Sequence, residues 1–271
     1  MTVISPSRAL PRSPHPARPT RLSVMIHSAK VAAFRARRLA VDAIAGPPRL
    51  TRARHGGHTE RVADSNTPLW IEEALAERAL QQGKVENLKR ACRALDGLVI
   101  PAGAVFSFWR QVGPPSASRG FVQGRALQLG CMVPAVGGGL CQLSNALYDA
   151  ALQAGCEIVE RHPHSRIVPG SAAALGRDAT VAWNYVDLRF RPPADFSLTA
   201  QVTADALIVR LHGLPGAAAS RRAIEQVGET STPELAAESC ASCNETGCFR
   251  HERNPAAASA HPNNPRRTPL R

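Results

Sequence analysis

The feature that most constrains this chain is a run of three glycines, residues 137–139, that leads directly into a helical pattern. Leu143 and Leu147 lie on one side of a segment that begins at Cys141, and Gly155 follows as a typical residue after a helix end. Cys141 is therefore expected in the first helical turn, where backbone N–H groups and the helix dipole favour a thiolate. The same pattern is typical of a tight turn before a small buried cysteine. Both interpretations stay open.

The surrounding sequence predicts an α+β domain over about residues 61–215. Thr67 and Pro68 are typical of a helix start, and Gly83 is expected to separate that helix from a second one, which ends at Asp96 and Gly97. The second helix has a core-facing apolar stripe that consists of Leu88, Ala91, Cys92 and Leu95. Short apolar runs predict strands at residues 98–100, 104–109, 121–129, 132–133, 156–161, 180–190, 196–203 and 207–211. The links at residues 191–195 and 204–205 are too short for crossovers. We therefore expect N-terminal helices followed by a largely antiparallel sheet, with a central helix that carries Cys141.

Charge is concentrated before this domain. The first 59 residues hold eleven basic residues and one acidic residue, Asp42, which accounts for ten of the formal net charge of +12. Pro, Arg and Ser dominate the first twenty residues, so residues 1–60 are expected to form a disordered basic tail that can approach an anionic surface or an acidic protein partner. Within it, residues 24–44 are Arg-rich and partly amphipathic, which is typical of a helix lying on a surface.

The cellular location is inferred from what the sequence lacks. No stretch approaches the roughly eighteen apolar residues that a membrane span needs, and the short apolar run at residues 24–26 is followed at once by His27. Seven irregularly spaced cysteines argue against a disulfide framework. The sequence therefore predicts a cytoplasmic protein without a transmembrane span.

Several linked segments resemble the VanW family, which is named for an accessory protein of inducible vancomycin-resistance clusters. They are residues 87–88, 98–112, 119–124, 136–148 (VGGGLCQLSNALY), 160–165 and 184–190, in that order. The resemblance implies a domain linked to cell-envelope and antibiotic-resistance biology, and no established reaction comes with it.

Cys141 is the candidate nucleophile. In papain-like and transglutaminase-like proteins a cysteine begins a helix, and a histidine and then a carboxylate or amide follow on neighbouring strands; here the order is Cys141, His164 and then Asp178, with Asp187 as the alternative carboxylate. The imidazole would deprotonate the thiol and later protonate the leaving group, while the carboxylate would hold the imidazole tautomer. Gln142 or the backbone N–H groups around Gly139 would stabilise an oxyanion.

Alternatives remain for both partners of Cys141. His162 and His164 fall on one face of an extended segment, so either is a candidate base. Asp178 is equally typical of a turn residue paired with Arg177, and Asp187 is equally typical of an outward-facing strand residue. A phosphate-binding loop is disfavoured, because the glycines are followed by neither Lys-Ser/Thr nor a GxGxxG register.

A second motif lies near the C-terminus. Beyond a linker at residues 216–238, the segment 239–253 holds Cys240, Cys243, Cys248 and His251, and residues 254–271 are expected to be disordered. Three thiolates and one imidazole suit a tetrahedral Zn²⁺ site, with an iron–sulfur cluster as the alternative. The family resemblance does not extend to this segment, so a docking role toward an unknown protein partner fits this zinc knuckle.

Two functions from different classes follow. The first is a cysteine-dependent hydrolase or acyl/amide transferase that acts on a peptide or peptidoglycan-precursor ligand. The second is a non-catalytic binding or scaffold protein whose basic tail and zinc knuckle make the contacts. Nucleic-acid binding is disfavoured, because the cations lie in a tail without interleaved aromatic residues.

Overall fold

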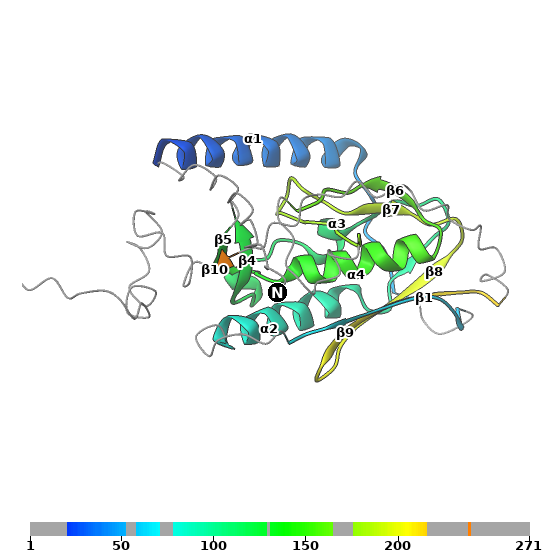
Figure 1. The fold of residues 1–271 in the computed structure, drawn as a ribbon. Coiled ribbons are helices and arrows are strands. Elements are labelled where there is room, and N and C mark those ends of the chain that lie inside the picture. The colour runs from blue at the N-terminus through cyan, green and yellow to red at the C-terminus, as the bar shows by residue number, and fades with distance from the viewer. Residues whose placement is uncertain are drawn as a thin grey trace, which may run out of the picture.

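The computed structural model describes residues 21–52, 58–70, 78–128, 131–164, 176–215 and 238–239, which form an α+β fold (Figure 1). The helices are α1 (Arg21–Ala45), α2 (Arg78–Leu95), α3 (Phe108–Val112) and α4 (Leu140–Gln153), with a short 3₁₀ turn at Ala117–Arg119. The strands are β1 (Glu60–Pro68), β2 (Val99–Ile100), β3 (Phe106–Ser107), β4 (Gln123–Gln128), β5 (Cys131–Val136), β6 (Glu157–Glu160), β7 (Arg189–Arg191), β8 (Phe196–Val202), β9 (Ala206–Gly213) and β10 (Glu238–Ser239). The α+β class expected from the sequence is confirmed.

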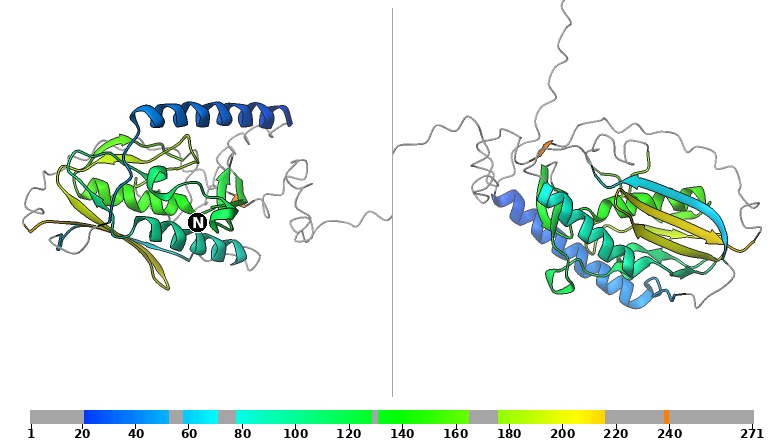
Figure 2. Two further views of the ribbon diagram at one scale, coloured as in Figure 1. Left: turned by 180° about the vertical axis from the view of Figure 1, so that it is seen from behind. Right: turned by 90° about the horizontal axis from the view of Figure 1, so that it is seen from below.

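The described strands form three small sheets. Their orders are β1-β9-β8-β2, β10-β5-β4 and β3-β7-β6, and every pair is antiparallel except β10 with β5. The four-stranded sheet and α1 lie on opposite sides of the molecule, and α2 and α4 lie between them (Figures 1 and 2).

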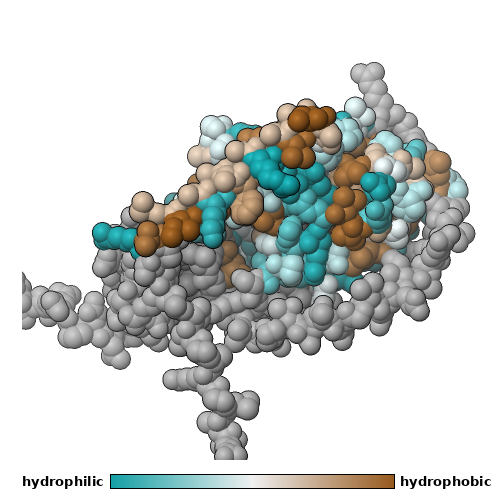
Figure 3. Space-filling model, turned by 90° about the horizontal axis from the view of Figure 1, so that it is seen from above, coloured by the Kyte–Doolittle hydropathy of each residue, from teal (hydrophilic) through white to brown (hydrophobic). Residues whose placement is uncertain are grey.

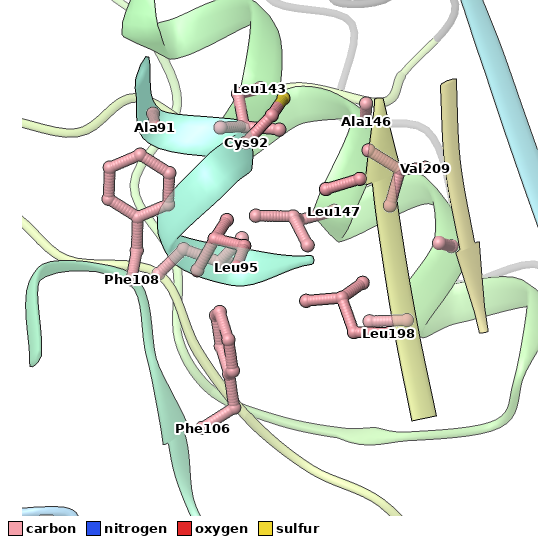
Figure 4. Packing of buried hydrophobic residues seen from close by; sticks show 14 of the residues in the cluster. Ala91, Cys92, Leu95, Phe106, Phe108, Leu143, Ala146, Leu147, Leu198 and Val209 are labelled. Atoms are coloured by element: carbon pink, nitrogen blue, oxygen red, sulfur yellow. The ribbon is translucent and has the colours of Figure 1, made fainter. Parts of the chain in front are cut away.

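The core forms where α2 and α4 pack on the four-stranded sheet. Leu95 of α2, Leu147 of α4 and Leu198 of β8 converge there (Figure 4), and each is at most 1% exposed. Full burial of such a side chain contributes about 1.5–3 kcal/mol. The apolar stripe predicted for the second helix is therefore the face that α2 buries, and the helix ends at Leu95, before Asp96 and Gly97, as expected.

The helix start predicted at Thr67 and Pro68 is wrong. Both residues belong to β1, where they pair with Leu207 and Ala206 of β9. Pairing with β9 outweighs the weak strand propensity of the polar residues in β1. A strand thus precedes α2, so the chain does not begin its domain with helices alone.

The predicted break at Gly83 is also wrong, because α2 runs through it from Arg78 to Leu95. A Cβ atom at Gly83 would lie 1.8 Å from the carbonyl oxygen of Gln123. The glycine therefore permits the close approach of α2 to β4.

Two predicted strands are shorter than expected. Of residues 180–190 only the end is in a strand, β7, and an isolated bridge joins Ala182 to Val186. Of residues 104–109 only Phe106 and Ser107 form a strand, because the Ser107 hydroxyl accepts the Arg110 N–H at 3.2 Å and caps α3. The other strands predicted after residue 120 are confirmed within one to three residues at their ends.

The tail expected to be disordered over residues 1–60 contains a helix and part of a strand. Residues 21–45 form α1, a long helix that lies along the outside of β6 and β7 (Figure 1), and β1 begins at Glu60. Residues 1–20 lie outside the described residues, as do 216–237 and 240–271. None of the helices in the described part of the chain combines the length and apolarity needed to cross a membrane.

Candidate functional site

The glycine turn before α4 is held in place by two other elements. Gly139 caps α4 with φ +97°, a conformation that favours glycine. A Cβ atom at Gly138 would lie 2.3 Å from the carbonyl oxygen of Gly124 in β4. Asn87 of α2 donates from Nδ2 to the Gly138 carbonyl at 2.9 Å and to the Val122 carbonyl at 2.9 Å. The turn is therefore fixed, and Cys141 becomes the second residue of α4.

The Cys141 thiol faces the segment of residues 178–181. Its Sγ lies 3.7 Å from Thr180 Oγ1 and 3.7 Å from the Val181 carbonyl oxygen. Two polar residues of α4 hold this segment: the Ser144 hydroxyl donates to the Ala179 carbonyl, and Asn145 Oδ1 accepts the Ala179 N–H at 2.8 Å. Cys141 is half-buried.

His164 and Asp178 meet beside Cys141. The Asp178 side chain is buried, and its Oδ2 accepts the backbone N–H of His164 at 2.6 Å, while its Oδ1 contacts His164 Nδ1. Since Asp178 occupies Nδ1, Nε2 is the ring nitrogen that remains for the thiol. Arg161 donates from Nε to the Asp178 carbonyl at 2.6 Å and stacks on Tyr148 of α4.

The electrostatics of the site favour an ion pair between Cys141 and His164. Burial by itself would raise the pKa of the Cys141 thiol, but the hydrogen bond and charge of His164, and then a backbone hydrogen bond of Val181 and the Thr180 side chain, lower it overall. Burial would lower the pKa of His164, yet its hydrogen bonds to Asp178 and Cys141 raise it to about 10. The site therefore favours a thiolate beside an imidazolium more than an isolated cysteine and histidine would.

Two other described cysteines have the opposite character. Cys92 and Cys156 are buried, and burial raises the pKa of each thiol to about 12. Cys92 thus belongs to the core, as its place on the apolar stripe of α2 indicated.

The alternative residues of the sequence lie elsewhere. The His162 side chain is 50% exposed and its Nε2 lies 3.5 Å from Glu160 Oε1, away from the Cys141–His164 pair. Gln142 donates from Nε2 to Thr67 Oγ1 at 3.1 Å and to the Pro68 carbonyl at 2.8 Å, so this amide ties α4 to the end of β1. Arg177 pairs with Asp149 at 3.1 Å instead of with Asp178.

Asp187 sits in a different cluster. Its carboxylate accepts the Ser107 hydroxyl at 2.6 Å, the Trp109 N–H at 3.1 Å and Arg189 Nε at 2.9 Å. Burial raises the pKa of Asp187, although Ser107 and Arg189 oppose that rise. Its partners are structural groups, and it does not contact His164.

Sequence reasoning missed the residues that position this site: Ser144, Asn145, Thr180 and Arg161. One signal was available for two of them. In the sequence, Ser144 and Asn145 stand next to apolar residues of a helix. The structure buries both, and a buried polar side chain needs a hydrogen-bond partner.

The described residues contain no group of three or more metal-ligating side chains. Cys240, Cys243, Cys248 and His251 lie outside the described residues, so the zinc knuckle stays a prediction.

A half-buried cysteine at a helix start, a histidine and a buried aspartate place the site in the class of cysteine–histidine–aspartate arrangements. The family comparison agrees with the motifs: residues 83–212 match the model described as VanW like protein. Residues 83–212 therefore form a VanW-like domain.

Two relatives share this region. The chain is 35% identical over 130 residues to the Vancomycin B-type resistance protein VanW of Enterococcus faecalis, which covers 46% of each protein. It is 36% identical over 110 residues to the Uncharacterized protein YoaR of Bacillus subtilis, covering 41% of this chain and 36% of that protein. The chain therefore spans less than half the length of these curated relatives. No solved structure matches it significantly.

Proposed function

We propose that the protein is a cysteine-dependent hydrolase or acyl/amide transferase in which Cys141 is the nucleophile, His164 the acid–base group and Asp178 the residue that orients His164. The observation that carries the proposal is the arrangement of Asp178 at His164 Nδ1 beside Cys141 at the start of α4, with which the lowered pKa of Cys141 and the raised pKa of His164 agree. A buried structural cysteine would instead have a raised pKa, as Cys92 has.

The reaction would proceed through a thioester. The Cys141 thiolate attacks a carbonyl carbon, and an S–C bond forms as the carbonyl oxygen becomes an oxyanion. The oxyanion then collapses, the C–N or C–O bond of the leaving group breaks, and the leaving group takes the proton of the His164 imidazolium. Water or an acceptor amine next attacks the thioester and gives its proton to His164, and the thiolate leaves as the new acyl product forms.

The first turn of α4 would stabilise the oxyanion. The first N–H groups of an α-helix have no acceptor within the helix, so those of Leu140 and Cys141 are suitable donors. Gln142 was a candidate for this role, but its amide N–H groups already donate to Thr67 and Pro68. We therefore assign the oxyanion to backbone donors.

The substrate class follows from the family alone. A relative is named as a vancomycin-resistance protein, so we infer that the acyl donor is a peptide or peptidoglycan-precursor ligand in cell-envelope biology. A cytoplasmic precursor would fit the expected location of the chain.

Alkylation of the full chain with iodoacetamide across pH, read by mass spectrometry at each cysteine, tests the nucleophile. Cys141 should react at pH 7 faster than a model thiol such as glutathione, while Cys92 and Cys156 should not react before unfolding. Equal rates for Cys141 and glutathione, with the same apparent pKa, would sink the proposal.

Catalysis is tested separately from reactivity. The wild-type protein should turn over an activated acyl ester with a transient thioester on Cys141, and Cys141→Ser should abolish both the thioester and the turnover. If Cys141→Ser keeps the resistance phenotype and partner binding, the alternative holds: a non-catalytic binding or scaffold protein.

We also propose that Cys240, Cys243, Cys248 and His251 bind Zn²⁺ as a docking module. Metal analysis of the purified protein should find zinc, and the variant Cys240→Ser/Cys243→Ser should lose it. Iron with sulfide in place of zinc would support the iron–sulfur alternative instead.

A further inference from the structure

Helix α1 is attached to the rest of the protein by its polar side. Arg38 donates from Nη1 to Glu160 Oε2 at 2.7 Å, and Asp42 pairs with Arg189 at 2.7 Å. The side chains of both pairs are at most 18% exposed. Phe34 adds a stacked contact with Tyr185. The inward face of α1 therefore combines these two ion pairs with the partly buried Val24 and Val31.

The opposite face of α1 is apolar and exposed. At about 100° per residue, Leu22, Met25 and Ile44 fall on the side opposite Arg38 and Asp42, and they are 66%, 69% and 88% exposed. Alanines fill most of the space between them. Seen from above, apolar residues extend along this helix (Figure 3). A surface helix normally buries its apolar stripe against the core, and α1 does the reverse.

The borders of this apolar face are basic. Arg21 lies on one border, and Lys30 and Arg37 lie on the other, all three exposed. Asp42 is the only acidic residue within residues 21–45, and its ion pair with Arg189 turns it inward. The outward face thus combines exposed apolar side chains with cations and has no negative charge.

We propose that α1 docks the protein on a lipid bilayer that contains anionic lipids. The helix lies flat, Leu22, Met25 and Ile44 enter the boundary between headgroups and acyl chains, and Arg21, Lys30 and Arg37 contact lipid phosphates. A second protein would more often offer a mixed surface, whereas cations on both borders of an apolar stripe match an anionic bilayer.

Docking through α1 would also orient the Cys141 site. Arg35 of α1 donates to the carbonyl of Trp183, which follows shortly after Val181, the residue whose carbonyl contacts Cys141. The docking surface and the segment beside the thiol are therefore parts of one packed unit. The proposal does not depend on catalysis by Cys141.

Flotation of the full chain with vesicles tests the proposal, using phosphatidylcholine with and without phosphatidylglycerol. We expect binding to the anionic vesicles that weakens with salt, and little binding to phosphatidylcholine alone. Leu22→Gln/Met25→Gln/Ile44→Gln should weaken binding about tenfold or more. The control Leu214→Gln replaces a leucine that is 51% exposed and lies after β9, and it should bind as the wild type does.

A second variant separates charge from apolar contact. Lys30→Gln/Arg37→Gln keeps the apolar face and should lose most of the preference for phosphatidylglycerol. Equal binding of the triple variant and the wild type would overturn the proposal. A second result would also overturn it: the wild-type protein fails to float and sediments as a dimer, and the triple variant sediments as a monomer. The apolar face of α1 would then be the contact with a second copy of the chain.

Discussion

Two buried aspartates nine positions apart, Asp178 and Asp187, have different roles in this protein. Asp178 contacts one ring nitrogen of His164 and thereby reaches the Cys141 thiol through a single intermediary. Asp187 accepts hydrogen bonds from Ser107, Trp109 and Arg189, and Arg189 also pairs with Asp42 of α1. The first carboxylate is oriented toward a reactive group, and the second joins separate segments of the fold.

The comparison teaches that burial of a carboxylate does not identify its role. Both aspartates are at most 4% exposed, and only their partners separate them. A titratable partner that touches a nucleophile is a sign of chemistry, whereas an arginine and backbone groups are signs of structure. Substitutions in each cluster test whether the two clusters are independent.

The largest effect is expected from Asp187→Ala. The substitution would remove one carboxylate partner of Arg189 and the acceptor of the Ser107 hydroxyl. We expect a loss of about 3–5 kcal/mol in the free energy of unfolding. Urea unfolding followed by tryptophan fluorescence measures this change. Asp187→Asn, which keeps the shape, should lose less and leave the alkylation rate of Cys141 within about twofold. A collapse of that rate in a folded Asp187→Asn protein would show that the two clusters are coupled.

His164→Gln should have the next largest effect. Without His164 the pKa of Cys141 returns to at least its ordinary value of 9.0, because burial then dominates. The thiolate fraction at pH 7 then falls to about 1%, which slows alkylation. A more basic thiolate is also more nucleophilic, which offsets part of this loss, so alkylation should slow by between about tenfold and a hundredfold. The wild-type rate should rise less between neutral pH and pH 9 than the variant rate, because the pKa of Cys141 is lowered only in the wild type. Asp178→Asn should also slow the alkylation of Cys141.

Asp42→Ala tests the link between the Asp187 cluster and α1. The variant removes a partly buried partner of Arg189, and we expect a loss of about 1 kcal/mol, confined to the docking of α1. Hydrogen exchange should become faster in residues 21–45 while the alkylation of Cys141 stays unchanged. Slower alkylation would mean that α1 supports the reactive site.

Thr180→Val should produce the smallest effect. Thr180 Oγ1 lies 3.7 Å from Cys141 Sγ and makes the weakest of the contributions that lower the pKa of the thiol. Sulfur is a weak hydrogen-bond partner, so the alkylation rate at pH 7 should fall by about twofold at most. A loss as large as that of His164→Gln would place Thr180, and not the imidazole, as the main partner of the thiolate.

The sequence allowed Cys141, His164 and Asp178 to be named as a set because each clue was local. Three glycines before an apolar periodicity position a cysteine at a helix start, and a histidine after a short strand is visible in the same way. The choice between Asp178 and Asp187 could not be made from the local sequence. It depends on how residues 176–188 fold back, and the strand predicted there is largely absent.

Long-range pairing explains most of the other differences. β1 is polar and was not predicted, since its stability comes from β9, where Arg210 pairs with Asp64 across 146 positions. The contacts of Ala179 with Ser144 and Asn145 span about 35 positions. Periodicity within one segment contains no information about a partner so far away. The amphipathic helix predicted within residues 24–44 is part of α1, but the direction of its apolar face could not be predicted, because the inward ion pairs involve the distant residues Glu160 and Arg189.

The hydrogen bonds around α4 also determine when the thiol becomes reactive. Asn87, Gln142 and Asn145 join the glycine turn and α4 to α2, to β1 and to the segment beside His164. These contacts connect positions far apart in the chain, so the unfolded chain lacks them. An unfolded chain therefore carries an ordinary thiol with a pKa near 9.0, and the thiolate appears only with the complete tertiary structure. Reactivity of Cys141 is thus a property of the native state, and its alkylation at neutral pH can serve as a measure of the folded fraction during refolding.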